Sequence, residues 1–118
     1  MVFCGEVPHA DLHVYYERAM MFCLASRIEP FGLVLLEAGA FRLPVIATAV
    51  GGILEILDHG KTGCLVPVED PIKLAQEILR LVSAADERAR LGYALFEHVQ
   101  HDFSWGRAYQ QYLKICDR

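Results

Sequence analysis

The chain has 118 residues, of which 54% are hydrophobic, and its formal net charge is −4. This length suits one domain with a modest core, the apolar fraction excludes a disordered chain, and the negative charge argues against a nucleic-acid-binding surface. No apolar run reaches the ~18 residues that a membrane-spanning helix needs, and no basic region precedes an apolar one at the N-terminus. We therefore expect a cytoplasmic protein, either free or held at a membrane surface.

Short apolar runs alternate with helical patterns along the chain. The runs that predict strands are Val2 to Cys4, Met21 to Ala25, Val45 to Thr48 and Cys64 to Val66. Asp11 suits the N-cap of a helix that ends before Met21, and a second helix is predicted to begin near Leu33. This alternation predicts an α/β fold, a three-layer Rossmann-like parallel sheet with helices on both faces.

Three more helices are predicted after the last of these strands. Asp70 and Pro71 combine a capping carboxylate with proline at the first helical position, and an apolar stripe follows them up to Val82. The next helix is predicted from about Asp86 to His98. A final one is predicted after Ser104, with a broad apolar face from Trp105 to Cys116.

The cysteines and histidines give no sign of a disulfide framework or a metal site. Cys4, Cys23, Cys64 and Cys116 are widely spaced and form no C-x-x-C pair, which is typical of reduced, buried cysteines. His9, Asp11 and His13 alternate across a predicted loop and helix start, and no fourth ligand is evident. We therefore interpret these three as surface residues and expect no metal.

The most informative segment is Glu29-Pro30-Phe31-Gly32-Leu33-Val34-Leu35-Leu36-Glu37. Gly32 lets the backbone approach a ligand closely, and the helix that follows offers unpaired N–H groups to an anion such as a phosphate. Glu37 interrupts an apolar run, so its carboxylate either has a specific partner in the interior or faces solvent on a half-exposed helix.

This segment resembles the E-x7-E signature of the retaining glycosyltransferases with the GT-B fold, in particular family 4 (group 1). Further segments are similar to that family in the same order: Val2 to Val7, Asp11 to Tyr16, Leu43 to Thr48, Val50 to Glu55, Gly60 to Gly63 and Phe103 to Trp105. The resemblance covers nearly the whole chain and matches the C-terminal part of the family's donor-binding domain. It implies that residues 1–118 form a single, partial nucleotide-sugar-binding domain.

The resemblance also implies roles for the residues of the motif. Glu37 would bind the ribose hydroxyls of a nucleotide-sugar donor, such as a UDP- or GDP-sugar, and no other cofactor is expected. Glu29 would lie beside the transferred sugar and steady positive charge in the transition state; the alternative, which its position near Phe31 and Gly32 allows, is that it caps the next helix. Phe31, Gly32 and Leu33 would contact the sugar and the distal phosphate through their backbone N–H groups.

Two glycine segments carry weaker indications. Gly51 and Gly52 either face the ligand or simply make a tight turn between strand and helix. Gly5 to Val7 occupies the place where the family contacts the base, but a glycine after a strand is most often a turn.

The resemblance also implies that this chain lacks two parts of a complete family member: the acceptor-binding domain and the first half of the donor domain. The Arg and Lys that hold the donor diphosphate in the family lie in that missing half. We expect a glycosyltransferase fragment, inactive alone, that carries the donor half of an enzyme transferring a sugar to a hydroxyl with retention. The alternative is a non-catalytic nucleotide-binding or protein-interaction module. An exposed strand edge at Met1 to Cys4 or a neighbouring strand would favour a homo-oligomer, or a partner that supplies the missing N-terminal half.

Overall fold

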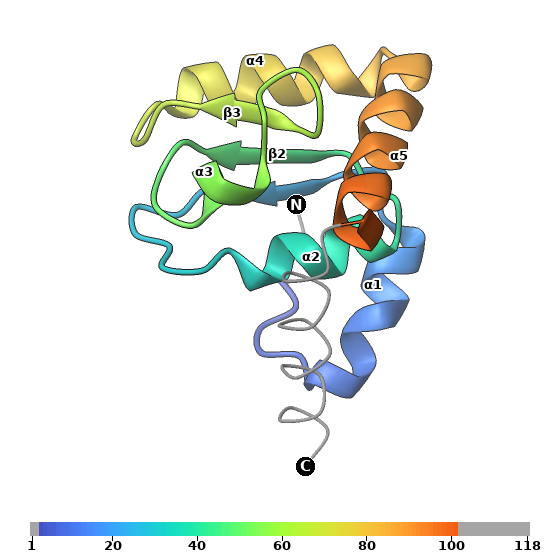
Figure 1. Cartoon of the computed structure of the whole chain (residues 1–118). Helices are drawn as coiled ribbons and strands as arrows, with labels where there is room; N and C mark the ends of the chain where they lie inside the picture. The colour runs from blue at the N-terminus through green and yellow to red at the C-terminus, as the bar shows by residue number, and fades with distance from the viewer. Residues whose placement is uncertain (1–2, 102–118) are drawn as a thin grey trace.

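A computed structural model describes residues 3–101 of the chain. The described elements follow one another along the chain as η1 (His9–Asp11), α1 (Leu12–Arg18), β1 (Phe22–Leu24), α2 (Leu33–Ala40), β2 (Val45–Thr48), α3 (Ile53–Ile56), β3 (Cys64–Val66), α4 (Pro71–Val82) and α5 (Ala85–His101) (Figure 1). The predicted helix after Ser104 and Cys116 lie outside the described residues.

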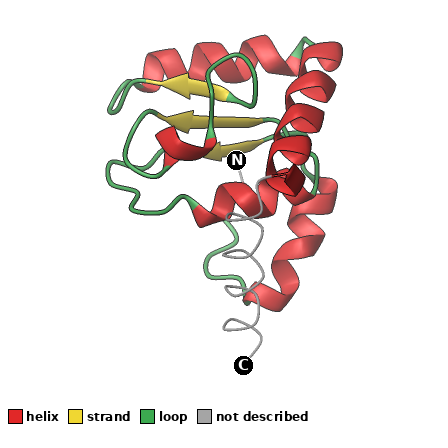
Figure 2. Ribbon diagram, in the orientation of Figure 1, coloured by secondary structure: helices red, strands yellow, loops and turns green. Residues whose placement is uncertain are grey.

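Strands β1, β2 and β3 form a parallel sheet in that order. Phe22 is in register with Val45, and Ile46 with Cys64. Each strand is joined to the next through a helix, α2 or α3, as parallel strands require (Figure 2). All residues of β2 are buried, as expected for a central strand with helices on both faces.

Two apolar clusters lie on opposite faces of this sheet. On one face, α1, α2 and α3 pack against β2 around Leu35, Leu36, Val45, Ala47 and Ile53. On the other, α4 packs against β2 and β3, and this cluster contains Ile46, Cys64, Val66, Leu81 and Leu91. The predicted α/β fold, with helices on both faces of a parallel sheet, is confirmed (Figure 1).

Helix α5 joins the two helical layers at the amino ends of the strands. Leu91 belongs to the cluster under α4, whereas Leu95 and Val99 belong to the cluster around α2. Gly92 lies so close to the chain just before β2 that a Cβ there would meet the carbonyl oxygen of Arg42. Because α5 covers the amino ends of the strands, it does not cover their carboxyl ends. The loop that carries Glu29 lies at the carboxyl ends.

One predicted strand does not form. Phe3 and Cys4 have no strand structure, so the strand expected at Val2 to Cys4 is wrong for its described residues. A strand needs a neighbour with which to exchange hydrogen bonds, and the sheet pairing of the described chain begins only at β1. Phe3 is 88% exposed, so its apolar side chain is not part of the core.

Of the two predicted N-cap residues within the described chain, Asp70 caps its helix through its side chain and Asp11 does not. The side chain of Asp70 accepts a hydrogen bond from the Lys73 amide at 3.0 Å, and Pro71 is the first residue of α4, so this start is confirmed. Asp11 precedes α1 but its side chain makes no capping bond, because it has helical backbone angles within η1 instead of the extended ones of a capping residue.

The cysteines are less buried than their apolar surroundings predict. Cys4, Cys23 and Cys64 are free thiols, and of these only Cys64 is buried. Cys4 lies in the exposed N-terminal loop, and Cys23 lies on β1, which among residues 3–101 has a neighbouring strand on one side only. None of the helices within residues 3–101 is long and apolar enough to cross a membrane.

Candidate ligand site at the carboxyl ends of the strands

Three loops meet where the parallel strands end. They are residues 25–32 after β1, 49–52 after β2 and 67–70 after β3. In open α/β sheets, ligands bind in the crevice outside the carboxyl ends of the strands. The loop that contains Glu29 is therefore in the right place for a ligand site.

Main-chain contacts with the double glycine hold the Glu29 loop in place. The carbonyl oxygen of Glu29 accepts a hydrogen bond of 2.7 Å from the amide of Gly52. A Cβ on Gly51 would collide with that oxygen, and a Cβ on Gly52 would lie 2.6 Å from the carbonyl carbon of Phe31. Gly51 and Gly52 thus make the turn into α3 and also seat the neighbouring loop, a contact that the sequence did not reveal.

Gly32 forms the junction between this loop and α2. It has left-handed backbone angles (φ 67°, ψ 27°), which glycine adopts without strain, and it is the N-cap residue of the helix. Its amide donates a 3.1 Å hydrogen bond to Oε1 of Glu29. The Glu29 carboxylate therefore does cap the next helix. Of the first-turn amides, that of Leu35 donates to the carbonyl oxygen of Gly32 at 3.0 Å, whereas those of Leu33 and Val34 belong to the group that a helix itself does not pair.

Glu37 lies inside the fold. Only 3% of the residue is exposed, so the interpretation that it faces solvent is wrong. The hydroxyl of Tyr16, in α1, donates a 2.8 Å hydrogen bond to Oε2 of Glu37. Sequence reasoning missed this donor, although an acid within an apolar helix signals that a polar partner lies elsewhere in the chain.

The first part of the motif, apart from the buried Gly32, lies closer to the surface. Glu29 and Leu33 are partly buried, whereas the side chain of Phe31 is 66% exposed. Ile28 and Leu54 add further exposed apolar surface on the Glu29 loop and on α3. The two glutamates therefore differ in environment: the Glu29 loop borders solvent, and the Glu37 carboxylate is held in the interior.

A pocket of about 320 Å³ lies at the same end of the sheet, on the side of α4. It is lined by Ala25, Arg27, Thr48, Val66, Pro67, Glu69, Asp70, Pro71 and Leu74. Arg27 and Glu69 pair across the two loops at 3.2 Å, and both side chains are largely exposed. Neither Glu29 nor Glu37 lines this pocket, so it is distinct from the site that the motif predicts.

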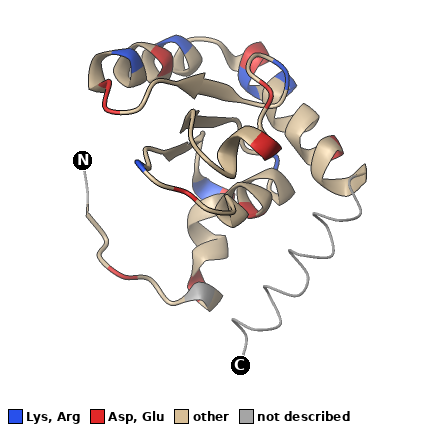
Figure 3. Cartoon of the chain, turned by 60° about the vertical axis from the view of Figure 1, so that its left-hand side comes forward, with Lys and Arg blue, Asp and Glu red and all other residues tan. Residues whose placement is uncertain are grey.

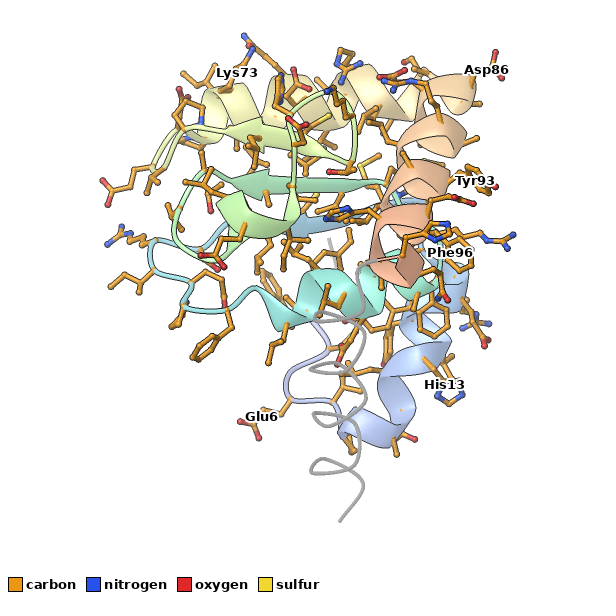
Figure 4. All side chains as sticks on the ribbon, in the orientation of Figure 1. Glu6, His13, Lys73, Asp86, Tyr93 and Phe96 are labelled. Carbon is orange, nitrogen blue, oxygen red and sulfur yellow. The ribbon has the colours of Figure 1, made fainter. Side chains whose placement is uncertain are left out.

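Charge and possible metal ligands are scattered over the described chain. Acidic and basic residues both occur on α4, so this surface has no single sign (Figure 3). Within residues 3–101, no three His, Cys, Asp or Glu residues are grouped so as to hold a metal ion. Nδ1 of His13 lies 2.8 Å from the carbonyl oxygen of Ala10, and the ring is exposed (Figure 4).

Comparison with known proteins identifies the family. Residues 1–98 match the family model described as glycosyl transferases group 1. The chain belongs to this family. Together with the fold, the match assigns it to the C-terminal part of a GT-B glycosyltransferase.

Solved and curated relatives agree with this assignment. Sucrose-phosphate synthase from Thermosynechococcus elongatus has 38% sequence identity and a TM-score of 0.83 over 97% of this chain and 29% of its own. D-inositol 3-phosphate glycosyltransferase 1 from Catenulispora acidiphila is 37% identical over 92% of this chain. Anabaena HepE, solved with UDP-glucose, shares the fold at 24% identity, with a TM-score of 0.74 over 87% of this chain and 29% of its own.

This chain matches only a minor part of its relatives. It spans 26% of the length of the Catenulispora enzyme and 22% of that of a probable sucrose-phosphate synthase from Thermosipho melanesiensis. The relatives therefore contain much more protein than the segment that carries Glu29 and Glu37.

Proposed function

We propose that the carboxyl end of this sheet is the donor half of a retaining glycosyltransferase site, which binds a nucleotide-sugar between the Glu29 loop and the start of α2. The observation that carries the proposal is the joint placement of two glutamates in a group 1 glycosyltransferase chain. Glu29 is seated at the strand ends by Gly52, and Glu37 is held on α2 by Tyr16.

Each group has a chemical role that its position supports. The Glu37 carboxylate can accept two hydrogen bonds from the vicinal hydroxyls of a ribose. The backbone N–H groups of Phe31, Gly32 and Leu33 would face the sugar and the distal phosphate, helped by the positive end of the α2 dipole. Glu29 would bind sugar hydroxyls and stabilise positive charge as the glycosidic bond breaks.

The bond between Gly32 and Glu29 links these roles. The Gly32 amide donates to Oε1 of Glu29 at 3.1 Å. If a donor phosphate accepts from that amide instead, the Glu29 carboxylate is released toward the sugar. The capping role and the donor role of Glu29 would then be two states of one side chain.

We expect this chain to bind a donor without turning it over. Electrostatic stabilisation of the leaving group is usually the largest single contribution to such a reaction. Arg27, the cation nearest to Glu29 in sequence, is paired with Glu69, and the relatives extend far beyond the matched segment. For the whole enzyme, we propose transfer of the sugar from a nucleotide-sugar to an acceptor hydroxyl with retention of configuration. The proposal names neither the nucleotide nor the acceptor molecule.

A thermal-shift panel tests the proposal. UDP, GDP, ADP and their glucose conjugates are titrated into the wild-type chain and into Glu37→Met, which keeps the length of the side chain but removes the carboxylate. We expect a concentration-dependent rise in Tm with at least one nucleotide in the wild type, and none in Glu37→Met. Glu17→Met, the same change at an exposed position of α1, should respond like the wild type. Equal responses in all three chains would contradict the proposal.

The alternative, a non-catalytic interaction module that oligomerises, draws on one observation. Strand β1 pairs only with β2, so its other edge has no neighbour among the described residues. An unpaired edge is a template for another strand. The thermal-shift panel separates the two functions, because a module of this kind would show no shift with any nucleotide.

A further inference from the structure

The strongest unassigned feature of the site is the tyrosine that contacts the buried glutamate. Tyr16 lies 21 positions before Glu37 and on a different helix, yet its hydroxyl donates to Oε2 at 2.8 Å. Tyr16 is 9% exposed and Glu37 is 3% exposed. Removing one partner of a buried hydrogen bond costs more free energy than removing one partner of an exposed hydrogen bond.

The ring of Tyr16 is fixed by two aromatic neighbours. Phe41, at the end of α2, stacks on it with ring centres 5.2 Å apart and planes only 12° apart. Phe22, on β1, packs against it with ring centres 5.8 Å apart. With both neighbours in place the ring has little freedom to swing, so the position of its hydroxyl oxygen is set by the core.

We infer that Tyr16 is a positioning residue, which fixes the direction of the Glu37 carboxylate for hydrogen bonding to the donor. This inference rests on the proposed function, in which Glu37 contacts the ribose. Tyr16 itself would touch no substrate. A carboxylate offers about four acceptor positions, of which the Tyr16 hydroxyl uses one.

The physical reason is the length of the glutamate side chain. Three rotatable bonds separate its carboxylate from the α2 backbone, so α2 alone does not determine where the two oxygens point. A hydrogen bond from a clamped donor selects one arrangement before a ligand arrives, which lowers the ordering cost on binding. In this way α1 and β1 contribute to the site without contacting the ligand.

The test is a double-mutant cycle built from Tyr16→Phe, Glu37→Met and the two together. Tyr16→Phe removes only the hydroxyl and keeps the ring between Phe22 and Phe41. Tyr93→Phe is the matched control: this tyrosine lies on the outer side of α5, where the hydrogen bond that it shares with Glu97 raises the pKa of its hydroxyl (Figure 4). Each chain is measured by urea unfolding and by calorimetric titration with UDP and UDP-glucose below its unfolding transition.

We expect Tyr16→Phe to weaken UDP binding about tenfold, because the hydrogen bond that fixes the direction of the Glu37 side chain is lost. Because Glu37→Met is expected to abolish binding, the double mutant should bind no UDP either, and the cycle in that background is followed by urea unfolding. Tyr93→Phe should bind like the wild type. A purely structural tyrosine would instead lower the urea midpoint and leave the affinity of the folded chain unchanged, and that result would overturn the inference.

Urea unfolding tests the contact between Tyr16 and Glu37 even if no nucleotide binds to the chain. If the wild type fails to bind any nucleotide, the proposed function fails. The positioning contact is still tested, because Tyr16→Phe should then shift the urea midpoint in the wild-type background more than in the Glu37→Met background. Equal shifts in both backgrounds would show that the hydroxyl does not act through Glu37, and would overturn the inference independently of ligand binding.

Discussion

The carbonyl oxygen of Glu29 accepts a 2.7 Å hydrogen bond from the amide of Gly52. This bond joins the loops that follow two neighbouring strands, and it leaves no room for a side chain at the glycine turn. The position of Glu29 is therefore set by residues more than twenty places further along the chain. The double glycine therefore does more than make a turn, because it also holds the loop of the candidate site.

Gly51→Ala should destabilise the protein by about 2 kcal/mol or more, because the new Cβ collides with the Glu29 carbonyl and Gly51 has a φ of +48°. Gly60→Ala is the control: its φ is +80°, but a Cβ there would meet nothing within 4 Å. That change should cost only the left-handed backbone strain of about 1 kcal/mol. Urea unfolding measures both, and equal losses would show that the contact with the Glu29 loop contributes nothing.

Gly92→Ala tests how closely α5 packs against the amino end of β2. Alanine favours a helix by about 1 kcal/mol over glycine, yet a Cβ here would collide with the carbonyl oxygen of Arg42. We expect a net loss of stability at position 92. In the same helix, the exposed Ala89→Gly should also destabilise, by about 1 kcal/mol, because there propensity alone acts. A more stable Gly92→Ala protein would contradict the close packing.

Cys64 should be the slowest of the described thiols to react with iodoacetamide at neutral pH. Burial raises the pKa of this thiol, an effect that the nearby Arg80 guanidinium, 3.3 Å from Sγ, opposes. A raised pKa means less of the reactive thiolate at a given pH, so labelling of Cys64 should increase as the pH rises from 7 to 9. Mass spectrometry after timed labelling checks this against the exposed Cys4, and comparable rates at pH 7 would contradict it.

The edge of β1 that no described strand pairs with predicts self-association. The Phe22 amide donates to Pro44 at 2.9 Å, so by alternation along the strand the N–H and C=O of Cys23 point to the unpaired side. We expect a homo-oligomer in sedimentation velocity, weakened by Cys23→Lys, since an edge charge disfavours strand pairing. Cys4→Lys, in the N-terminal loop, should leave association unchanged. A monomer at all micromolar concentrations would exclude the oligomer.

Local patterns predicted much of this fold from the sequence. The limits of β2 and β3 match their apolar runs, and α4 begins where Asp70 and Pro71 place it, because burial of these strands and the capping of this helix depend on nearby residues. The strand predicted at Val2 to Cys4 does not form at its described residues, Phe3 and Cys4, for a different reason. Its residues have strand propensity, but a strand also needs a partner, which no local pattern supplies.

The candidate site was predictable only in part. The spacing of Glu29 and Glu37 and the glycine between them are visible in the sequence, and α2 does begin at Leu33. The contacts that fix both glutamates are not visible in the sequence, because Gly52 and Tyr16 come from distant segments of the chain. Hydrogen bonds between distant segments leave no periodic signal, so only the structure identifies them.

The most direct test is to map UDP-glucose binding on the amide NMR spectrum of the ¹⁵N-labelled chain. A donor held at this site predicts shifts for Phe31, Gly32 and Leu33 and for the Gly51–Gly52 turn, all of which disappear in Glu37→Met. Shifts confined to Glu69 and Leu74 would place the ligand in the pocket beside α4. That result, or a spectrum that UDP-glucose leaves unchanged, would contradict a donor site at Glu29 and Glu37.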